Sequence, residues 1–212
     1  MKKLFAALLA LVLALGLAGC GQKKTDTDDA AGDGDIPETP VKLETLHVEF
    51  VKGERDTDDL LALRDALPLV PALGAQNVEI GSAAVTFGTS ADATAQALAE
   101  GSVDVAFLPL TACFDHADTI TLALVQDADE GAAIEDREAI AVTKKNKTVA
   151  SDAFLAALRG AVEELCASDE GSAALSLYQY GETKAYTAAE LSDFASERAA
   201  YEEAKQLREN EP

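Results

Sequence analysis

Apolar positions alternate or recur at helical spacing through residues 44–109, and they predict a regular succession of elements. "LHVEFV" alternates as a half-buried strand does, whereas "VDVAFLP" is a continuous apolar run typical of a strand buried on both faces. We expect strands at 46–51, within 77–88 (where Gly81-Ser82 could divide it) and at 103–109, with helices at 56–68 and 89–101. This β-α-β-α-β order indicates an α/β layer with right-handed crossovers.

The second half of the chain continues with strands and then becomes helical. We expect strands at 119–126 and 138–144 around an acidic loop at 127–137, a helix beginning at Ser151, a short one at 168–177, and a last one opened by a Thr187–Glu190 capping box. The fold class is therefore α/β. We predict a single lobe with a mainly parallel sheet flanked by helices, followed by C-terminal helices that pack on its surface.

The N-terminus carries a targeting pattern. Lys2 and Lys3 precede an apolar run at 4–17, which is shorter than the roughly 20 residues of a membrane-spanning helix and is typical of a secretory signal peptide. "LAGC", ending at Cys20, resembles the lipobox of bacterial lipoproteins. That resemblance implies cleavage after residue 19, acylation of Cys20, and attachment to the extracytoplasmic face of the cell membrane. An ordinary signal peptide with an incidental cysteine is the alternative.

Residues 20–43 read as a disordered acidic linker, so the folded domain is expected at 44–212. The linker is not an EF-hand loop, because Ala31 and Pro40 stand where that loop needs oxygen ligands. The formal net charge of the chain is −21, which repels nucleic acid and anionic lipid head groups and opposes long-range capture of an anion.

Two cysteines remain once Cys20 is assigned to the lipid anchor. Export would permit a disulfide between Cys113 and Cys166. Cys166 lies on the apolar face of a predicted helix, so two small buried hydrophobic side chains are the alternative interpretation.

Two longer segments carry a family resemblance. "TSADATAQALAEGSVDVAFLPLTAC" (89–113) and the closing segment at 139–194 resemble substrate-binding lipoproteins of phosphate, phosphite and phosphonate ABC transporters, the PhnD-like type with a type II periplasmic-binding-protein-like fold. The resemblance implies non-covalent binding of a small oxyanion and delivery to an ABC permease. Only residues 110–137 stand where the family has a second α/β lobe, so the chain resembles a shortened, one-lobed relative.

Ligands of such folds sit beyond the carboxyl ends of strands, where helix N-termini offer free N–H groups to anions. The positions that match here are Lys52, Gly53, Thr89, Ser90, Pro109 and Thr111. Lys52 would supply charge, and the hydroxyl groups would hold an oxyanion. The alternative is that Thr89 or Ser90 only caps its helix, because Asp92 already lies at the favourable end of the helix dipole.

Other chemistries lack their motifs. His47 and His116 are the only histidines, and neither HExxH, G-x-S-x-G nor a P-loop is present. We therefore expect no enzyme, no cofactor and no metal. The second functional hypothesis is a degenerate one-lobed lipoprotein that binds protein partners and has no small-molecule ligand.

Overall fold

The computed structural model describes residues 39–51, 57–127, 133–169, 171, 175 and 185–210. The predicted signal peptide, Cys20, Lys52, Gly53 and most of the helix expected at 168–177 lie outside these residues. The strands are β1 (Val41–Val51), β2 (Val78–Gly88), β3 (Val105–Pro109), β4 (Ile120–Gln126), β5 (Glu138–Thr143) and β6 (Tyr186–Ala188). The helices are α2 (Thr57–Ala66), η1 (Leu67–Leu69), α3 (Pro71–Ala75), α4 (Ala91–Glu100), α5 (Leu110–Phe114), η2 (Ile134–Asp136), α6 (Asp152–Cys166), η4 (Leu191–Phe194) and α8 (Ala195–Glu209).

The described strands form one six-stranded sheet in the order β2-β1-β3-β5-β4-β6. β1 pairs in parallel with β2 and β3, whereas the β3–β5, β4–β5 and β4–β6 pairs are antiparallel. The α/β class is confirmed, but the expectation of a mainly parallel sheet is wrong. The sheet is mixed because β5, which follows β4 after residues 127–137, lies between β3 and β4 and is antiparallel to both.

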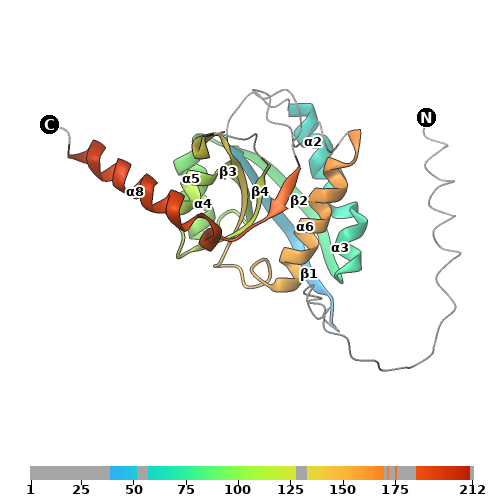
Figure 1. The fold of residues 1–212 in the computed structure, drawn as a ribbon. Helices are drawn as coiled ribbons and strands as arrows, with labels where there is room; N and C mark the ends of the chain where they lie inside the picture. Colours follow the sequence, from blue (N-terminus) through green and yellow to red (C-terminus); the bar gives the residue numbers. More distant parts are fainter. Residues whose placement is uncertain are drawn as a thin grey trace, which may run out of the picture. The chain divides into compact units, whose positions relative to one another are not determined.

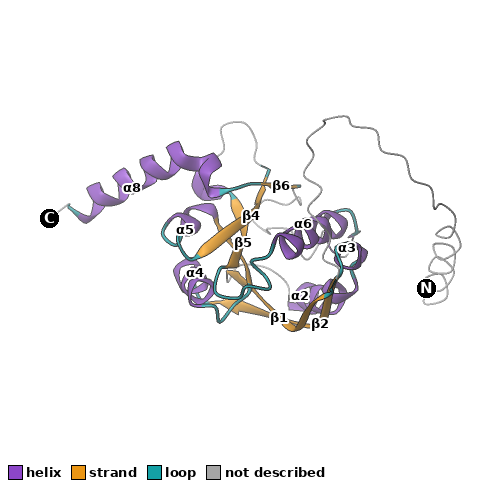
Figure 2. Cartoon of the chain, turned by 90° about the horizontal axis from the view of Figure 1, so that it is seen from below, coloured by secondary structure: helices purple, strands orange, loops and turns teal. Residues whose placement is uncertain are grey.

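Helices cover both faces of this sheet (Figures 1 and 2). One face carries Phe50, Phe107 and Ile140, which pack in a core with α2, α3 and α6. The other carries Leu108 and Leu122, which pack in a separate core with α4 and α5. The strands between the two layers are buried on both sides, which explains the unbroken apolar run of β3.

Local capping signals in the sequence fix the two long central helices. Ser90 caps α4, its hydroxyl oxygen accepting from the Ala93 N–H at 3.1 Å, and Gly101 closes α4 in the left-handed conformation at φ 84°. Ser151 caps α6 in the same way, through the Phe154 N–H at 3.3 Å. α4 begins and ends within two residues of its predicted bounds, and α6 begins one residue after the predicted start at Ser151.

Two boundaries differ from expectation. β1 begins at Val41, inside the predicted linker, because residues 41–43 pair with 78–80 of β2. β2 is not divided at Gly81 but runs on continuously, and a Cβ on Gly81 would lie 2.8 Å from the Glu44 carbonyl oxygen. Gly81 thus allows two long strands to approach closely rather than ending one of them.

The C-terminal helix starts differently from the prediction. The capping box joins Glu190 and Asp193 at the start of η4, whereas Thr187 lies on β6 and donates to the Asp127 carboxylate at 2.6 Å. α8 then extends away from the sheet (Figure 1), and none of its residues is buried. It contacts the end of α5, where Tyr201 and Lys205 bind the Asp115 carboxylate at 3.3 and 2.9 Å.

Candidate functional site

Strands β1 to β4 run in the same direction, so their carboxyl ends meet at one edge of the sheet. Val51 is in register with Gly88, and Phe50 with Phe107, two residues before the end of β3. We call this the carboxyl edge, and it is lined by Gly88, Pro109, Gln126, Glu138 and Tyr186. The sequence predicted that the loops at 88–90 and 109–111 would lie near one another, and the described strands place both at this edge.

The start of α4 is occupied by the protein's own groups. The Ser90 hydroxyl serves as the N-cap, and Thr89 lies exposed beside it. The Glu49 carboxylate lies behind the first turn, accepting from the Thr94 hydroxyl at 2.8 Å and from the Thr86 hydroxyl at 3.3 Å. An oxyanion at this helix end would meet a carboxylate rather than an empty cradle, so the capping interpretation of Ser90 is the one that the geometry favours.

Gly88 makes this arrangement sterically possible. A Cβ at residue 88 would lie 1.9 Å from the Thr94 Oγ1 and 2.5 Å from the Glu49 Oε1. Only a glycine leaves room for the Glu49–Thr94 hydrogen bond to cross over the end of β2.

At the junction between β3 and α5, the backbone N–H group is also bonded within the protein. Pro109 pairs with Glu138 of β5, and the Leu110 N–H donates to the Arg137 carbonyl oxygen at 2.9 Å. Thr111 is half-buried in the five-residue helix α5. Pro109 and Thr111 therefore lie at the carboxyl edge as predicted, but the amide between them is already bonded.

A row of side chains on neighbouring strands crosses the carboxyl edge. Glu138 of β5 is in register with Pro109 of β3. On its other side, Glu138 lies beside Gln126 of β4, because the preceding β4 residue pairs with Ala139. Gln126 is in turn in register with Tyr186 of β6. The Tyr186 hydroxyl donates to the Glu138 Oε2 at 2.5 Å. Cross-strand pairs lie on one face of a sheet, so the row Glu138, Gln126 and Tyr186 faces the α6 side.

Two of these polar side chains are buried, and Tyr186 is half-buried. Glu138 is 6% exposed and Gln126 is 3% exposed. The Gln126 carbonyl oxygen accepts from the Arg137 Nε and Nη2, each at 3.4 Å, yet the side-chain Nε2 of Gln126 has no hydrogen-bond partner among the described residues. Sequence reasoning missed all three; the only signal was a polar residue closing the apolar run of β4 and another opening that of β5.

Aromatic rings lie next to the row. Phe50 and Phe107 stack with their centroids 4.2 Å apart, and the Tyr186 ring meets Phe107 edge-on at 6.4 Å. Offset and edge-on pairs of this kind hold rings in fixed orientations. The carboxyl edge thus combines a rigid apolar wall with a carboxylate, a phenol and an amide.

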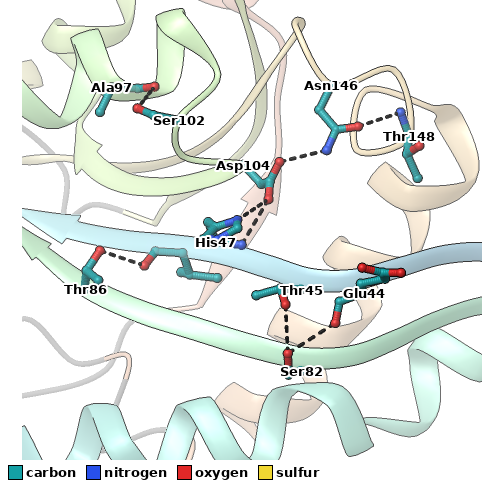
Figure 3. Close-up of polar contacts among 11 residues, drawn as sticks. Glu44, Thr45, His47, Ser82, Thr86, Ala97, Ser102, Asp104, Asn146 and Thr148 are labelled. Atoms are coloured by element: carbon teal, nitrogen blue, oxygen red, sulfur yellow. Dashed lines mark hydrogen bonds and ion pairs between the residues drawn. The ribbon is translucent and has the colours of Figure 1, made fainter.

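The opposite edge of the sheet holds a second polar network, around Asp104 (Figure 3). One Asp104 carboxylate oxygen accepts from the His47 backbone N–H at 3.0 Å and lies 3.3 Å from the His47 Nδ1; the other accepts from the Asn146 Nδ2 at 2.8 Å. Asn146 in turn accepts from the Thr148 N–H at 3.1 Å. The Asp of the "VDVAF" motif therefore joins β1, β3 and the β5–α6 loop, which is a structural role.

The two cysteines do not form a disulfide. Both are free thiols; Cys113 lies in the core on the α4 side and Cys166 packs against the core on the α6 side. The sheet separates them, which corrects the pairing left open by the sequence. Burial raises the pKa of the Cys113 thiol to about 12 and also raises that of Cys166, so both behave as small apolar side chains.

Two other features are absent from the described residues. No group of three His, Cys, Asp or Glu side chains there could hold a metal ion. Nor is any helix of that part of the chain both long enough and apolar enough to cross a membrane. Comparison with protein-family models, curated proteins and solved structures finds no match for this chain.

Proposed function

We propose that this protein is the extracytoplasmic solute-binding component of an ABC uptake system, held at the cell membrane by a lipid on Cys20. The observation that carries the proposal is the meeting of four strand ends at one edge, where the buried Glu138 and Gln126 and the half-buried Tyr186 form a polar row. Ligands of open α/β sheets bind outside the carboxyl ends of the strands. Binding is non-covalent, involves no cofactor and no catalytic step, and a membrane permease receives the solute.

The proposal gives the chain the fold of one periplasmic-binding-protein-like lobe. Helix α5 and strand β4 occupy much of residues 110–137, the position of the second lobe in the family that the sequence resembles. A missing or much reduced second lobe would leave the carboxyl edge open on one side. The permease, or another protein, would then cover the solute in place of domain closure.

The family resemblance makes phosphate, phosphite and phosphonates the first solutes to test. Thermal unfolding is measured with phosphate, phosphite, methylphosphonate and aminoethylphosphonate at millimolar concentration, because a ligand that binds only the native state raises the melting temperature. A saturable rise supports oxyanion uptake, and no rise with any of the four contradicts it. Lys52→Ala should weaken the response, whereas Lys42→Ala, whose ammonium pairs with Glu79 on the exposed strand surface, should leave it unchanged.

A protein-binding lipoprotein without a solute is the second candidate, and α8 favours it. This helix of 15 residues buries no side chain and extends from the domain, with charged residues over most of its surface and Leu207 64% exposed. A single exposed apolar side chain is ordinary on a protein surface, so the projection of α8 from the domain, rather than Leu207, favours this candidate. Photo-crosslinking from residue 207 in intact membranes, with residue 61 on α2 as the control position, would identify a partner that binds α8 specifically.

A further inference from the structure

The sheet has two edge strands, β6 and β2, and they differ in how much backbone they leave unpaired (Figure 2). β6 has only 3 residues, whereas β2 runs over Val78–Gly88 and pairs on one side alone, with β1. Apart from that pairing, the β2 backbone makes no hydrogen bond among the described residues. Backbone N–H and C=O groups need partners, so this edge is a template for a further strand.

The side chains of β2 lack the features that block pairing at a sheet edge. β2 contains no proline and no lysine, and its one charged residue, Glu79, pairs with Lys42 of β1 at 2.6 Å. Val85 and Phe87 are only half-buried, although they pack against the core on the α6 side. In a chain of formal charge −21, this long and nearly uncharged edge strand is suited to pairing with another strand.

The sequence of β2 is complementary to itself in the antiparallel direction. Opposite residues of an antiparallel pair lie on the same face of a sheet. With a two-fold axis at Ala84, the exposed Ser82 stands opposite the exposed Thr86 of a second copy. On the other face, Ala83 stands opposite Val85 of the second copy, and both belong to the α6-side core of their own domains.

Glycines let the same pairing continue toward both ends of β2. Gly81 stands opposite Phe87 of the second copy, so the ring meets no polar side chain. Gly88 stands opposite Ile80 in the same way. Glu79 falls outside the pairing, so no two carboxylates lie opposite each other. An axis at any other residue of β2 either shortens the pairing or sets core-facing side chains against exposed ones.

We propose that the β2 edge is a homodimer interface, at which two copies of this chain join their sheets through antiparallel β2 strands. This assembly does not depend on the proposed solute. One strand edge covers less than the roughly 1,200 Å² of a stable interface, so the dimer is weak and forms at micromolar to millimolar concentration. Leu61 of α2 and Leu69 of η1, which are 43% and 79% exposed, add apolar surface on the helices that pack on β2.

Sedimentation equilibrium measures the association and its dependence on charge. Ala84→Glu sets two carboxylates opposite each other at the axis and should raise the dimer dissociation constant by about tenfold or more. Ala200→Glu adds the same charge at an exposed position of α8 and should change it by less than about twofold. Salt should strengthen the dimer, because it screens the repulsion between two chains of formal charge −21. A monomer at millimolar concentration in high salt, or a dimer that Ala84→Glu leaves intact, would contradict the proposal.

Cysteine crosslinking tests the register with smaller changes to the strand. Ala84→Cys sets two thiols opposite each other and should give a disulfide-linked dimer on oxidation. Ser82→Cys is the matched control, because its two thiols would be offset by about 14 Å along the strands, beyond the reach of a disulfide. Mixing Ser82→Cys with Thr86→Cys should restore the link, and the wild type shows any link through the native cysteines. No link in Ala84→Cys, or an equal link in Ser82→Cys, would overturn the proposal.

Discussion

The Asp104 carboxylate binds the backbone N–H of His47 at 3.0 Å, and this contact fixes the start of β3 against the middle of β1. Asp104 is 6% exposed, and it also accepts from Asn146 at 2.8 Å. A single buried carboxylate thus joins three segments that are far apart in the sequence. Its contribution is to stability, on the side of the sheet away from the carboxyl edge.

Replacing this carboxylate should be costly. Asp104→Ala leaves the His47 N–H and the Asn146 amide without their acceptor, so the free energy of unfolding should fall by about 2–4 kcal/mol. Denaturant unfolding measures the loss. The exposed Asp118, near the same edge, is the control, and Asp118→Ala should change stability by less than about 0.5 kcal/mol. Equal effects of the two substitutions would contradict the structural role given to Asp104.

Two glycines should respond in opposite ways to the same substitution. Gly88→Ala puts a methyl group onto the Thr94 hydroxyl and the Glu49 carboxylate, and should lower the free energy of unfolding by about 1–3 kcal/mol. Gly74→Ala, in α3, meets no atom within 4 Å and should raise it by about 0.5–1 kcal/mol. Thermal unfolding of both variants tests the packing at the end of β2, and a neutral Gly88→Ala would show that this end is open.

Arg159 should stabilise the irregular middle of β4. The β4–β5 register shifts between Leu122 and Leu124, and the Ala123 carbonyl oxygen there accepts from the Arg159 Nε of α6 at 3.2 Å. Arg159→Met removes that donor and leaves the Ala123 carbonyl oxygen with the Ala189 N–H at 3.4 Å, so the free energy of unfolding should fall by about 1 kcal/mol. Arg198→Met, which removes an exposed pair with Glu202 on α8, should cost less than about 0.5 kcal/mol. If Arg159→Met lowered the free energy of unfolding no more than Arg198→Met does, the hydrogen bond from Arg159 to the Ala123 carbonyl oxygen would be contradicted.

Cys113 should make stability depend on alkaline pH. Burial raises its pKa from 9.0 to about 12, so the native state keeps the thiol protonated after the unfolded chain has ionised. This contribution is complete below pH 9.0 and is lost as the pH rises toward 12, with a slope of about 1.4 kcal/mol per pH unit. Denaturant unfolding between pH 8 and 11, compared with Cys113→Ala, isolates the slope. The same slope in both proteins would mean that the thiol is not buried.

Local signals predicted the elements well, because caps act within one helical turn. Ser90, Gly101 and Ser151 each set a helix end through bonds to residues at most four positions away. Strand order could not be predicted in this way. The insertion of β5 between β3 and β4 depends on pairs such as Phe107 with Ile140, which no local pattern encodes.

The sequence predicted where the candidate site lies, but not all of the residues that form it. The carboxyl edge follows from parallel strands, and Pro109 and Ser90 lie there as expected. Glu138 and Tyr186 were missed because they are brought together by β5 and β6, 48 residues apart in sequence. The sequence is compatible with Ser90 either as a helix cap or as a ligand-binding residue. The Glu49 carboxylate, bonded to Thr94 behind the first turn of α4, favours capping, and this contact could not be predicted from the sequence.

The most direct measurement is nuclear magnetic resonance of the ¹⁵N-labelled protein during titration with phosphate, phosphite, methylphosphonate and aminoethylphosphonate. Solute binding at the carboxyl edge predicts saturable shifts of the Gln126 side-chain amide and of the Gly88 and Phe107 backbone amides. The amides of His47 and Asp104, at the opposite edge, should not move. Shifts confined to α8, or no saturable shift with any of the four solutes, would contradict a solute site at the carboxyl edge.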